Sequence, residues 1–178
     1  MALFDAAYFV DDIEVVMFRH EQGAVHAAEG YARVAGRPAV VAATSGPGAT
    51  NLVTGLTDAY MDSVPVTAIT GQVATWVFGR DGFQETDILG VATPITKWVY
   101  QVKRPEEAVP AVKIAYEISR LGRPGPTLVD LPRDLQIMTP QGEAKIQINV
   151  SKFIPPKPRE EDIAKALKIV LEAERPVV

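Results

Sequence analysis

Short apolar runs alternate with helix-length segments along this chain, and this alternation limits the possible folds more than any other feature. The run 39–43 (Ala-Val-Val-Ala-Ala) has no polar position on either face, which is typical of a strand buried on both sides of a parallel sheet. An alanine-rich segment with helical character, 22–35, precedes it and ends at Gly36. The repeated alternation predicts an α/β protein with a doubly wound, mostly parallel sheet and helices on both faces.

The other elements continue this pattern. Apolar runs predict strands, and stretches with 3.6-residue periodicity predict the helices between them. We expect strands at 14–18, 66–69, 98–102 and 126–131, helices at 49–61 and 105–120, and a loop with a short helix at 71–90. Residues 3–8 look helical but follow no strand, so the first strand of the sheet is expected to be missing.

The character of the sequence changes near residue 150. Residues 1–150 hold the whole predicted sheet, whereas Pro155-Pro156-Lys157-Pro158 reads as a stiff linker. An amphipathic helix is predicted at 160–173. We therefore predict an N-terminally truncated domain at 1–150, and at 151–178 a linker with the first helix of an absent central domain.

Composition argues against several classes of site. The net charge of −4 provides no basic surface for nucleic acid, and the lack of cysteine excludes disulfides and thiolate metal sites. His20 and His26 are six residues apart and do not align on one helix face, so no metal ligand is predicted. Acidic residues interrupt the N-terminal stretch, and no apolar run reaches the ~18 residues of a membrane span. We expect a cytoplasmic protein that does not contact membranes.

Glu21 is the strongest candidate for chemistry. It follows the apolar stretch 13–16 and opens the helix at 22–35, so it is predicted at the carboxyl end of a strand. Ligands bind at that edge of open parallel sheets. A carboxylate near a helix N-terminus is also favoured by the macrodipole, by ~0.3–1 kcal/mol, so Glu21 taken alone is explained equally well as a structural charge.

Two more segments could contact a ligand. The turn 44–51 joins a buried strand to a helix, and its glycines permit close backbone approach, although it matches neither the Walker A nor the dinucleotide fingerprint. The segment 82–87 combines an aromatic residue with an amide and carboxylates, a pattern that most simply indicates a solvated face. Glycosidase-type chemistry is a weak alternative, because Asp58, Asp62 and Asp87 lack a spacing that fixes their geometry.

Taken together, these segments resemble a known family. Arg19-His20-Glu21-Gln22-Gly23, 28–33 and 43–51 are similar to the N-terminal pyrimidine-binding domain of thiamine diphosphate enzymes. The stretches 60–65, 68–73, 83–85 and 122–126 resemble the acetolactate synthase catalytic subunit in particular. The resemblance runs in order from residue 3 to about residue 135, and 160–178 resemble the start of that family's central domain.

The resemblance implies a role for each matched position. Glu21 would be catalytic, because its counterpart hydrogen-bonds the cofactor's aminopyrimidine ring and promotes the imino tautomer. The implied cofactor contacts come from Glu21, Gln84, Pro47, Gly48, Asn51, Ser63 and Arg123, with the last two near a structural FAD. The implied substrate contacts come from Phe83, Gln84 and Lys97, and the first two of these would serve the facing subunit.

The resemblance also implies parts that this chain does not contain. The family's Gly-Asp-Gly to Asn segment, which holds Mg²⁺ and the diphosphate, is absent, as is the Gly-rich loop before the first helix. Ala74 replaces a frequent proline and Arg133 a frequent lysine, both at the expected substrate channel. The isolated chain is therefore expected to be inactive and to contain only the pyrimidine half of the thiamine diphosphate site. Mg²⁺ and FAD are implied for the complete enzyme.

The implied reaction is decarboxylation of pyruvate and carboligation to a second 2-keto acid, in branched-chain amino acid biosynthesis. The implied partners are further copies of the chain, as a dimer or larger oligomer, or a complementing chain with the diphosphate-binding domain. Two alternatives stay open: a thiamine diphosphate enzyme of the sulfoacetaldehyde or oxalyl-CoA type, and a non-catalytic dimerising or regulatory module. Glyoxylate carboligase is disfavoured, because that enzyme lacks the glutamate.

Overall fold

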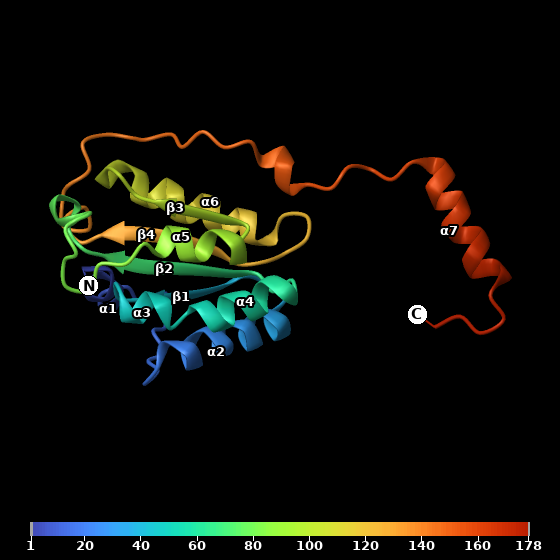
Figure 1. Cartoon of the computed structure of the whole chain (residues 1–178), viewed down its shortest axis with the longest axis horizontal. Helices are drawn as coiled ribbons and strands as arrows, with labels where there is room; N and C mark the ends of the chain where they lie inside the picture. Colours follow the sequence, from blue (N-terminus) through green and yellow to red (C-terminus); the bar gives the residue numbers. More distant parts are fainter. Residues whose placement is uncertain (1, 178) are drawn as a thin grey trace.

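The fold is a four-stranded parallel sheet covered by helices, and the computed structural model describes residues 2–177 (Figure 1). The strand order is β1-β2-β4-β3, and all neighbours run parallel, which confirms the predicted fold class. The strands are β1 (Ala39–Ala43), β2 (Val66–Gln72), β3 (Trp98–Gln101) and β4 (Thr127–Pro132). The helices are α1 (Ala2–Tyr8), α2 (Glu21–Ala35), α3 (Pro47–Thr50), α4 (Val53–Met61), α5 (Ile88–Ala92), α6 (Ala108–Arg120) and α7 (Glu160–Glu172). Short 3₁₀ turns are η1 (Thr75–Val77), η2 (Thr93–Ile95), η3 (Pro105–Glu107) and η4 (Val150–Phe153).

The two faces of the sheet bury different sets of helices. Strands β2 and β4 are buried at every position, and successive side chains of a strand point to opposite faces. Ala68 and Leu128 belong to the core shared with α2 and α4, whereas Ile69 and Val129 belong to the core shared with α6. Figure 1 shows α2 and α4 on one side of the sheet and α6 on the other. Burial on both faces explains why apolar residues occur on both faces of these strands.

Helix α2 begins and ends at residues suited to helix termini. The Nδ1 atom of His20 accepts a hydrogen bond from the backbone N–H of Gln22 at 3.1 Å, which satisfies a free donor of the first turn. Gly36 ends the helix in the left-handed conformation, with φ 64°, and donates its N–H to the carbonyl of Ala32. These two caps place Glu21 at the first position of the helix.

The strand predicted at 14–18 is wrong. Within the described residues, no backbone hydrogen bond joins this segment to the sheet, and β1 pairs only with β2. Val15 and Val16 are more than half exposed. An extended apolar segment becomes a strand only when a neighbour satisfies its backbone groups, and β-propensity alone cannot supply that neighbour. The segment instead leads into α2 as irregular backbone.

The C-terminal part of the described chain has few contacts with the sheet. Every residue of α7 is exposed, including the apolar residues Ile163, Leu167 and Val170. Figure 1 shows α7 standing apart from the helices that cover the sheet. Phe153 in η4 is the exception, because it packs beside Lys97. The predicted division between domains at residue 150 stays a prediction.

The described helices are short. The longest, α2, has 15 residues. No helix between residues 2 and 177 combines the length and the apolar character that crossing a bilayer requires. The predicted cytoplasmic location stays a prediction.

Candidate active site

The carboxyl edge of the sheet gathers most of the residues that the sequence singles out. All four strands run parallel, so the segments that follow β1 and β2 leave from the same edge. The turn 44–51 follows β1, and the loop that contains Phe83 and Gln84 follows β2. Glu21 lies against this turn at the start of α2. The structure thus brings together residues that are more than sixty positions apart in the chain.

Glu21 is held by a direct contact with the turn. The Nδ2 atom of Asn51 donates a hydrogen bond to Glu21 Oε2 at 3.0 Å. This bond, together with a backbone N–H at the helix start, lowers the pKa of the Glu21 carboxyl, since both donors favour the charged form. The side chain is half-buried. Glu21 is therefore an oriented, ionised carboxylate at the ligand-binding edge.

Gly48 lets the turn pack closely against this carboxylate. A Cβ atom at position 48 would lie 3.2 Å from Glu21 Oε1 and 2.7 Å from Thr44 Cγ2. Real Cβ contacts are rarely this short, so any side chain here would push Glu21 or Thr44 aside. Glycine at position 48 therefore keeps the backbone of the turn in close contact with the Glu21 carboxylate. Pro47, the first residue of α3, borders the same turn.

Gly46 joins the turn to the loop that carries Gln84. Gly46 has φ 59° and ψ −116°, and a Cβ atom there would lie 2.7 Å from the carbonyl oxygen of Gln84. Gln84 itself has φ 62°, which is uncommon for a residue with a side chain. Such strained backbone is frequent where a loop is held against a ligand site. Gln84 therefore lies beside the glycine turn, and its cofactor role stays a prediction.

Glu85 holds the rest of this loop. Its carboxylate accepts hydrogen bonds from the backbone N–H groups of Gly82 at 2.9 Å and Gly79 at 2.6 Å. These bonds lower the pKa of the Glu85 carboxyl. Phe83, by contrast, is 89% exposed and packs against nothing that would explain it as a core residue. The loop therefore presents Phe83 to the outside while Gln84 faces the turn.

The structure also reveals a buried polar group that sequence reasoning missed. Asp130 in β4 is fully buried and accepts hydrogen bonds from Thr70 Oγ1 at 2.7 Å and Gln101 Nε2 at 2.8 Å. Gln72 Nε2 lies 3.3 Å from the second carboxylate oxygen. Burial raises the pKa of the Asp130 carboxyl to about 6, although all three donors favour the charged form. The signal that could have identified this group is the aspartate within a mostly apolar predicted strand, because a buried charge needs hydrogen-bond partners.

Asp130 should make stability depend on pH. The pKa of the Asp130 carboxyl is about 6 in the folded protein and 3.8 for an aspartate free in water, so the folded state binds the proton more tightly. The Asp130 carboxyl makes its full contribution to the free energy of unfolding below pH 3.8. This contribution is lost as the pH rises through 6, by on the order of 3 kcal/mol in total. We expect the stability of Asp130→Asn, relative to the unchanged chain, to rise by a comparable amount between pH 4 and pH 7. Urea denaturation across this range measures it, and a pH-independent difference would contradict the assignment.

A second group of predicted residues lies at the opposite, amino edge of the sheet. Ser63, Lys97 and Arg123 each stand shortly before a strand begins. Arg123 Nε donates to Ser63 Oγ at 2.7 Å, and Nη2 donates to the carbonyls of Met61 at 2.9 Å and Tyr60 at 3.2 Å. The structure thus pairs Ser63 with Arg123 and separates both from Glu21, and their FAD contacts stay predictions.

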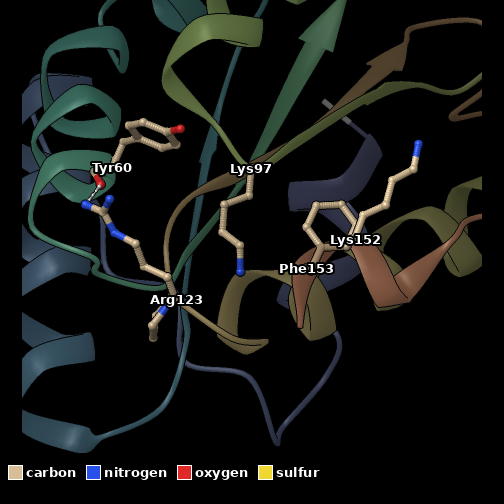
Figure 2. Close-up of a pocket in the computed structure, with 6 residues that line it drawn as sticks. Tyr60, Lys97, Arg123, Lys152 and Phe153 are labelled. Atoms are coloured by element: carbon tan, nitrogen blue, oxygen red, sulfur yellow. Dashed lines mark hydrogen bonds between the residues drawn. The ribbon is translucent and has the colours of Figure 1, made fainter. Parts of the chain in front are cut away.

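Lys97 lies in a pocket beside Arg123. Figure 2 shows its side chain reaching between Arg123 and Phe153, while Lys152 points away from it. The cavity has a volume of about 210 Å³ and is lined by Tyr60, Lys97, Arg123, Pro124, Lys152 and Phe153.

Lys97 Nζ donates to the carbonyls of Leu121, at 2.6 Å, and Ile118, which satisfies the free carbonyls at the end of α6. Burial lowers the pKa of the Lys97 amine to about 8. Lys97 is therefore placed away from Phe83 and Gln84, the other two predicted substrate residues, and its substrate role stays a prediction.

The carboxylates considered for glycosidase-type chemistry do not share one site. Asp87 caps α5 by accepting from the backbone N–H of Gly90 at 2.9 Å. Asp62 forms an ion pair with Arg33 at 2.6 Å, and Asp58 lies 3.9 Å from the ring of His26. Each carboxylate therefore has a separate structural partner, and no pair flanks a common space.

Comparison with known proteins agrees with the geometry at the carboxyl edge. The sequence profile described as the thiamine pyrophosphate enzyme, N-terminal TPP binding domain, matches residues 1–91. This range contains Glu21, the glycine turn and Gln84.

Relatives match over more of the chain. The chain is 46% identical to the probable acetolactate synthase large subunit of Methanocaldococcus jannaschii, with 100% of this chain and 31% of that protein aligned. It is 44% identical to the acetolactate synthase large subunit of Corynebacterium glutamicum, over 100% of this chain and 29% of that protein. The mitochondrial acetolactate synthase catalytic subunit of Saccharomyces cerevisiae is 50% identical over 76% of this chain and 20% of its own length.

The chain thus spans less than a third of the length of these relatives. The matched profile covers more than half of the chain, and the relatives share nearly half of its residues. By fold and sequence, the chain belongs to the thiamine pyrophosphate enzymes, as the N-terminal TPP-binding domain of the acetolactate synthase large subunits.

Proposed function

We propose that this chain supplies the pyrimidine half of the cofactor site in an acetolactate synthase. The complete enzyme would decarboxylate pyruvate and join the remaining two-carbon unit to pyruvate or 2-oxobutyrate. The observation that carries the proposal is the ionised Glu21, oriented by Asn51 and packed against the glycine turn at Gly48. The relatives of this chain favour an acetolactate synthase over an enzyme of the sulfoacetaldehyde or oxalyl-CoA type.

Glu21 would hold a proton on the cofactor's pyrimidine ring. An ionised carboxylate stabilises a protonated ring nitrogen through a short, charge-assisted hydrogen bond. Asn51 keeps the carboxylate ionised and oriented, and the glycine turn would lie beside the bound ring. Thiamine diphosphate, when bound, supplies the electron sink for decarboxylation. Gln84 and Phe83, on the loop held by Glu85, would border the bound cofactor and the 2-keto acid.

The amino-edge pocket would serve the structural FAD of the complete enzyme. Lys97, Lys152 and Arg123 give this pocket a cationic lining, and the planar guanidinium of Arg123 suits a phosphate contact. Ser63 holds that guanidinium in place. Mg²⁺ and the diphosphate half of thiamine diphosphate would be bound by a second domain or chain.

A chimera tests the proposed function. The chain alone, supplied with pyruvate, thiamine diphosphate, Mg²⁺ and FAD, should form no acetolactate. The same chain exchanged for the aligned part of the Methanocaldococcus large subunit should yield an active enzyme that prefers 2-keto acids to sulfoacetaldehyde and oxalyl-CoA. Turnover by the chain alone would contradict the divided site, and a folded but inactive chimera would contradict the function.

The chain is also proposed to form a dimer or larger oligomer. Apolar side chains on the outer face of α2 and on edge strand β1 are exposed, including Tyr31, Val34 and Val40. Exposed apolar surface beside an unpaired strand edge favours association with a second copy. Light scattering measures this, and a strictly monomeric chain at micromolar concentration would contradict it.

A further inference from the structure

Three possible metal ligands meet between helices α2 and α4, away from the candidate active site. His26 and Glu29 lie on α2, and Asp58 lies on α4. The Nδ1 atom of His26 is 3.3 Å from Glu29 Oε2 and 3.9 Å from Asp58 Oδ2, and the three ligand atoms all lie within 4.8 Å of one another. Eight residues, or about 12 Å of helix, separate Glu29 from Glu21. The cluster therefore does not belong to the cofactor site.

The packing of the two helices brings these side chains together. His26 and Glu29 are three residues apart and so share one face of α2. A Cβ atom at Gly55 would collide with the side chain of Val25, so only glycine lets α4 approach α2 this closely. Asp58 lies one turn after Gly55, and Figure 1 shows the two helices side by side. The close approach sets the distance across the cluster before any ligand binds.

Glu29 is the residue that points to a ligand. Its side chain is 94% buried and its carboxylate faces His26, yet its Oε1 atom has no hydrogen-bond partner among the described residues. A buried carboxylate oxygen without a partner is costly unless a cation or donor satisfies it.

The surrounding charges also favour a cation. Arg33, whose charge interacts with Glu29 and Asp58, is engaged by Asp62 at 2.6 Å. His26 and Asp58 are partly exposed, which leaves the cluster open to ions from solvent. The cluster thus combines two carboxylates and one imidazole with no uncommitted positive group in contact with them.

We propose that His26, Glu29 and Asp58 bind a divalent cation of the zinc class, with water as the fourth ligand. Nitrogen and oxygen ligands about 2.0–2.2 Å from a tetrahedral Zn²⁺ lie roughly 3.4 Å from each other. The separations of 3.3 and 3.9 Å from His26 are near this value, and the three atoms lie within 4.8 Å of one another, so Asp58 would move inward to complete the site. An imidazole ligand disfavours Mg²⁺, which prefers oxygen alone. The bound ion clamps α2, the helix that begins at Glu21, onto α4.

Titration of the purified chain with Zn²⁺, without thiamine diphosphate or Mg²⁺, tests the site. Calorimetry should show one ion per chain, and Co²⁺ used as a probe should give the intense visible absorption of a four-coordinate site. His26→Gln should weaken Zn²⁺ binding by at least about tenfold, and Glu29→Gln and Asp58→Asn should do the same. His20→Asn, which removes the other histidine but keeps a side chain able to cap α2, should bind Zn²⁺ as the unchanged chain does.

The outcomes separate this site from the proposed function. Weak binding that is unchanged in His26→Gln, or equal loss in His20→Asn, would overturn the assignment, as would the absence of saturable binding at millimolar Zn²⁺. Circular dichroism confirms that each variant is folded before its titration is interpreted. Because no cofactor is present, the zinc result stands whether or not the chimera makes acetolactate.

Discussion

Replacing Glu21 with glutamine should lower acetolactate formation by the chimera at least about 100-fold. Glutamine keeps the size of the side chain and can still accept a hydrogen bond from Asn51. It lacks the negative charge that would stabilise a protonated pyrimidine ring, so the loss should appear in kcat rather than in the overall fold. Steady-state kinetics at saturating thiamine diphosphate measure the change.

Two companion variants sharpen this test. Glu117→Gln removes an exposed glutamate of α6 that pairs with Arg120, and it should leave activity within about twofold. Asn51→Ala removes the donor that contributes most to lowering the pKa of Glu21, so the acidic limb of the pH–rate profile should move to higher pH. Activity above about a tenth of normal in Glu21→Gln would refute the role assigned to this carboxylate.

Gly46→Ala should destabilise the isolated chain by about 3 kcal/mol or more. The backbone at Gly46 is in a region that side chains rarely adopt, which costs on the order of 1–3 kcal/mol. The new Cβ atom would also press on the backbone of Gln84, and overpacking of this kind costs a further ~1–3 kcal/mol. Urea denaturation gives the free energy of unfolding.

Gly36→Ala is the matched control. Gly36 also has a positive φ, 64°, but a Cβ atom there meets nothing within 4 Å. This variant should cost only the left-handed backbone strain of about 1–2 kcal/mol. Trypsin cleavage at Arg80 should accelerate in Gly46→Ala and not in Gly36→Ala, since only the first loosens the loop that carries Gln84. Equal costs in both variants would show that the contact with Gln84 contributes nothing.

The parts of the fold that could be predicted are those in which local sequence and burial agree. Strands β2 and β4 were predicted because their apolar residues are buried on both faces. The run 39–43 was predicted as a strand, β1, but its burial on both faces was wrong, because β1 lies at the edge of the sheet and Val40 is exposed. Segment 14–18 was predicted wrongly, because its apolar residues indicate extended backbone but say nothing about a partner strand. Hydrogen-bond partners across a sheet are a property of the whole fold.

The sequence also predicted some residues of the candidate site but not the contacts between them. Glu21 and the glycine turn each adjoin an element boundary, and such boundaries in parallel sheets point to the ligand edge. The contact between Gly46 and Gln84 joins residues 38 positions apart, and no pattern in the chain signals it. The same holds for Asp130, whose donors come from β2 and β3, and for the cluster formed by His26, Glu29 and Asp58. These groups share no sequence spacing, because the packing of separate elements determines which of them meet.

Phe153 beside Lys97 has a mechanical consequence for α7. The segment between residues 154 and 159 is the only covalent tether of this helix to the described body, and Phe153 anchors its near end at the amino edge of the sheet. A force applied to α7 would therefore act first on Lys97 and on the C-terminal end of α6, to which Lys97 is hydrogen-bonded. Glu21 lies at the opposite edge of the sheet, and the full length of the strands separates it from the point where this force acts.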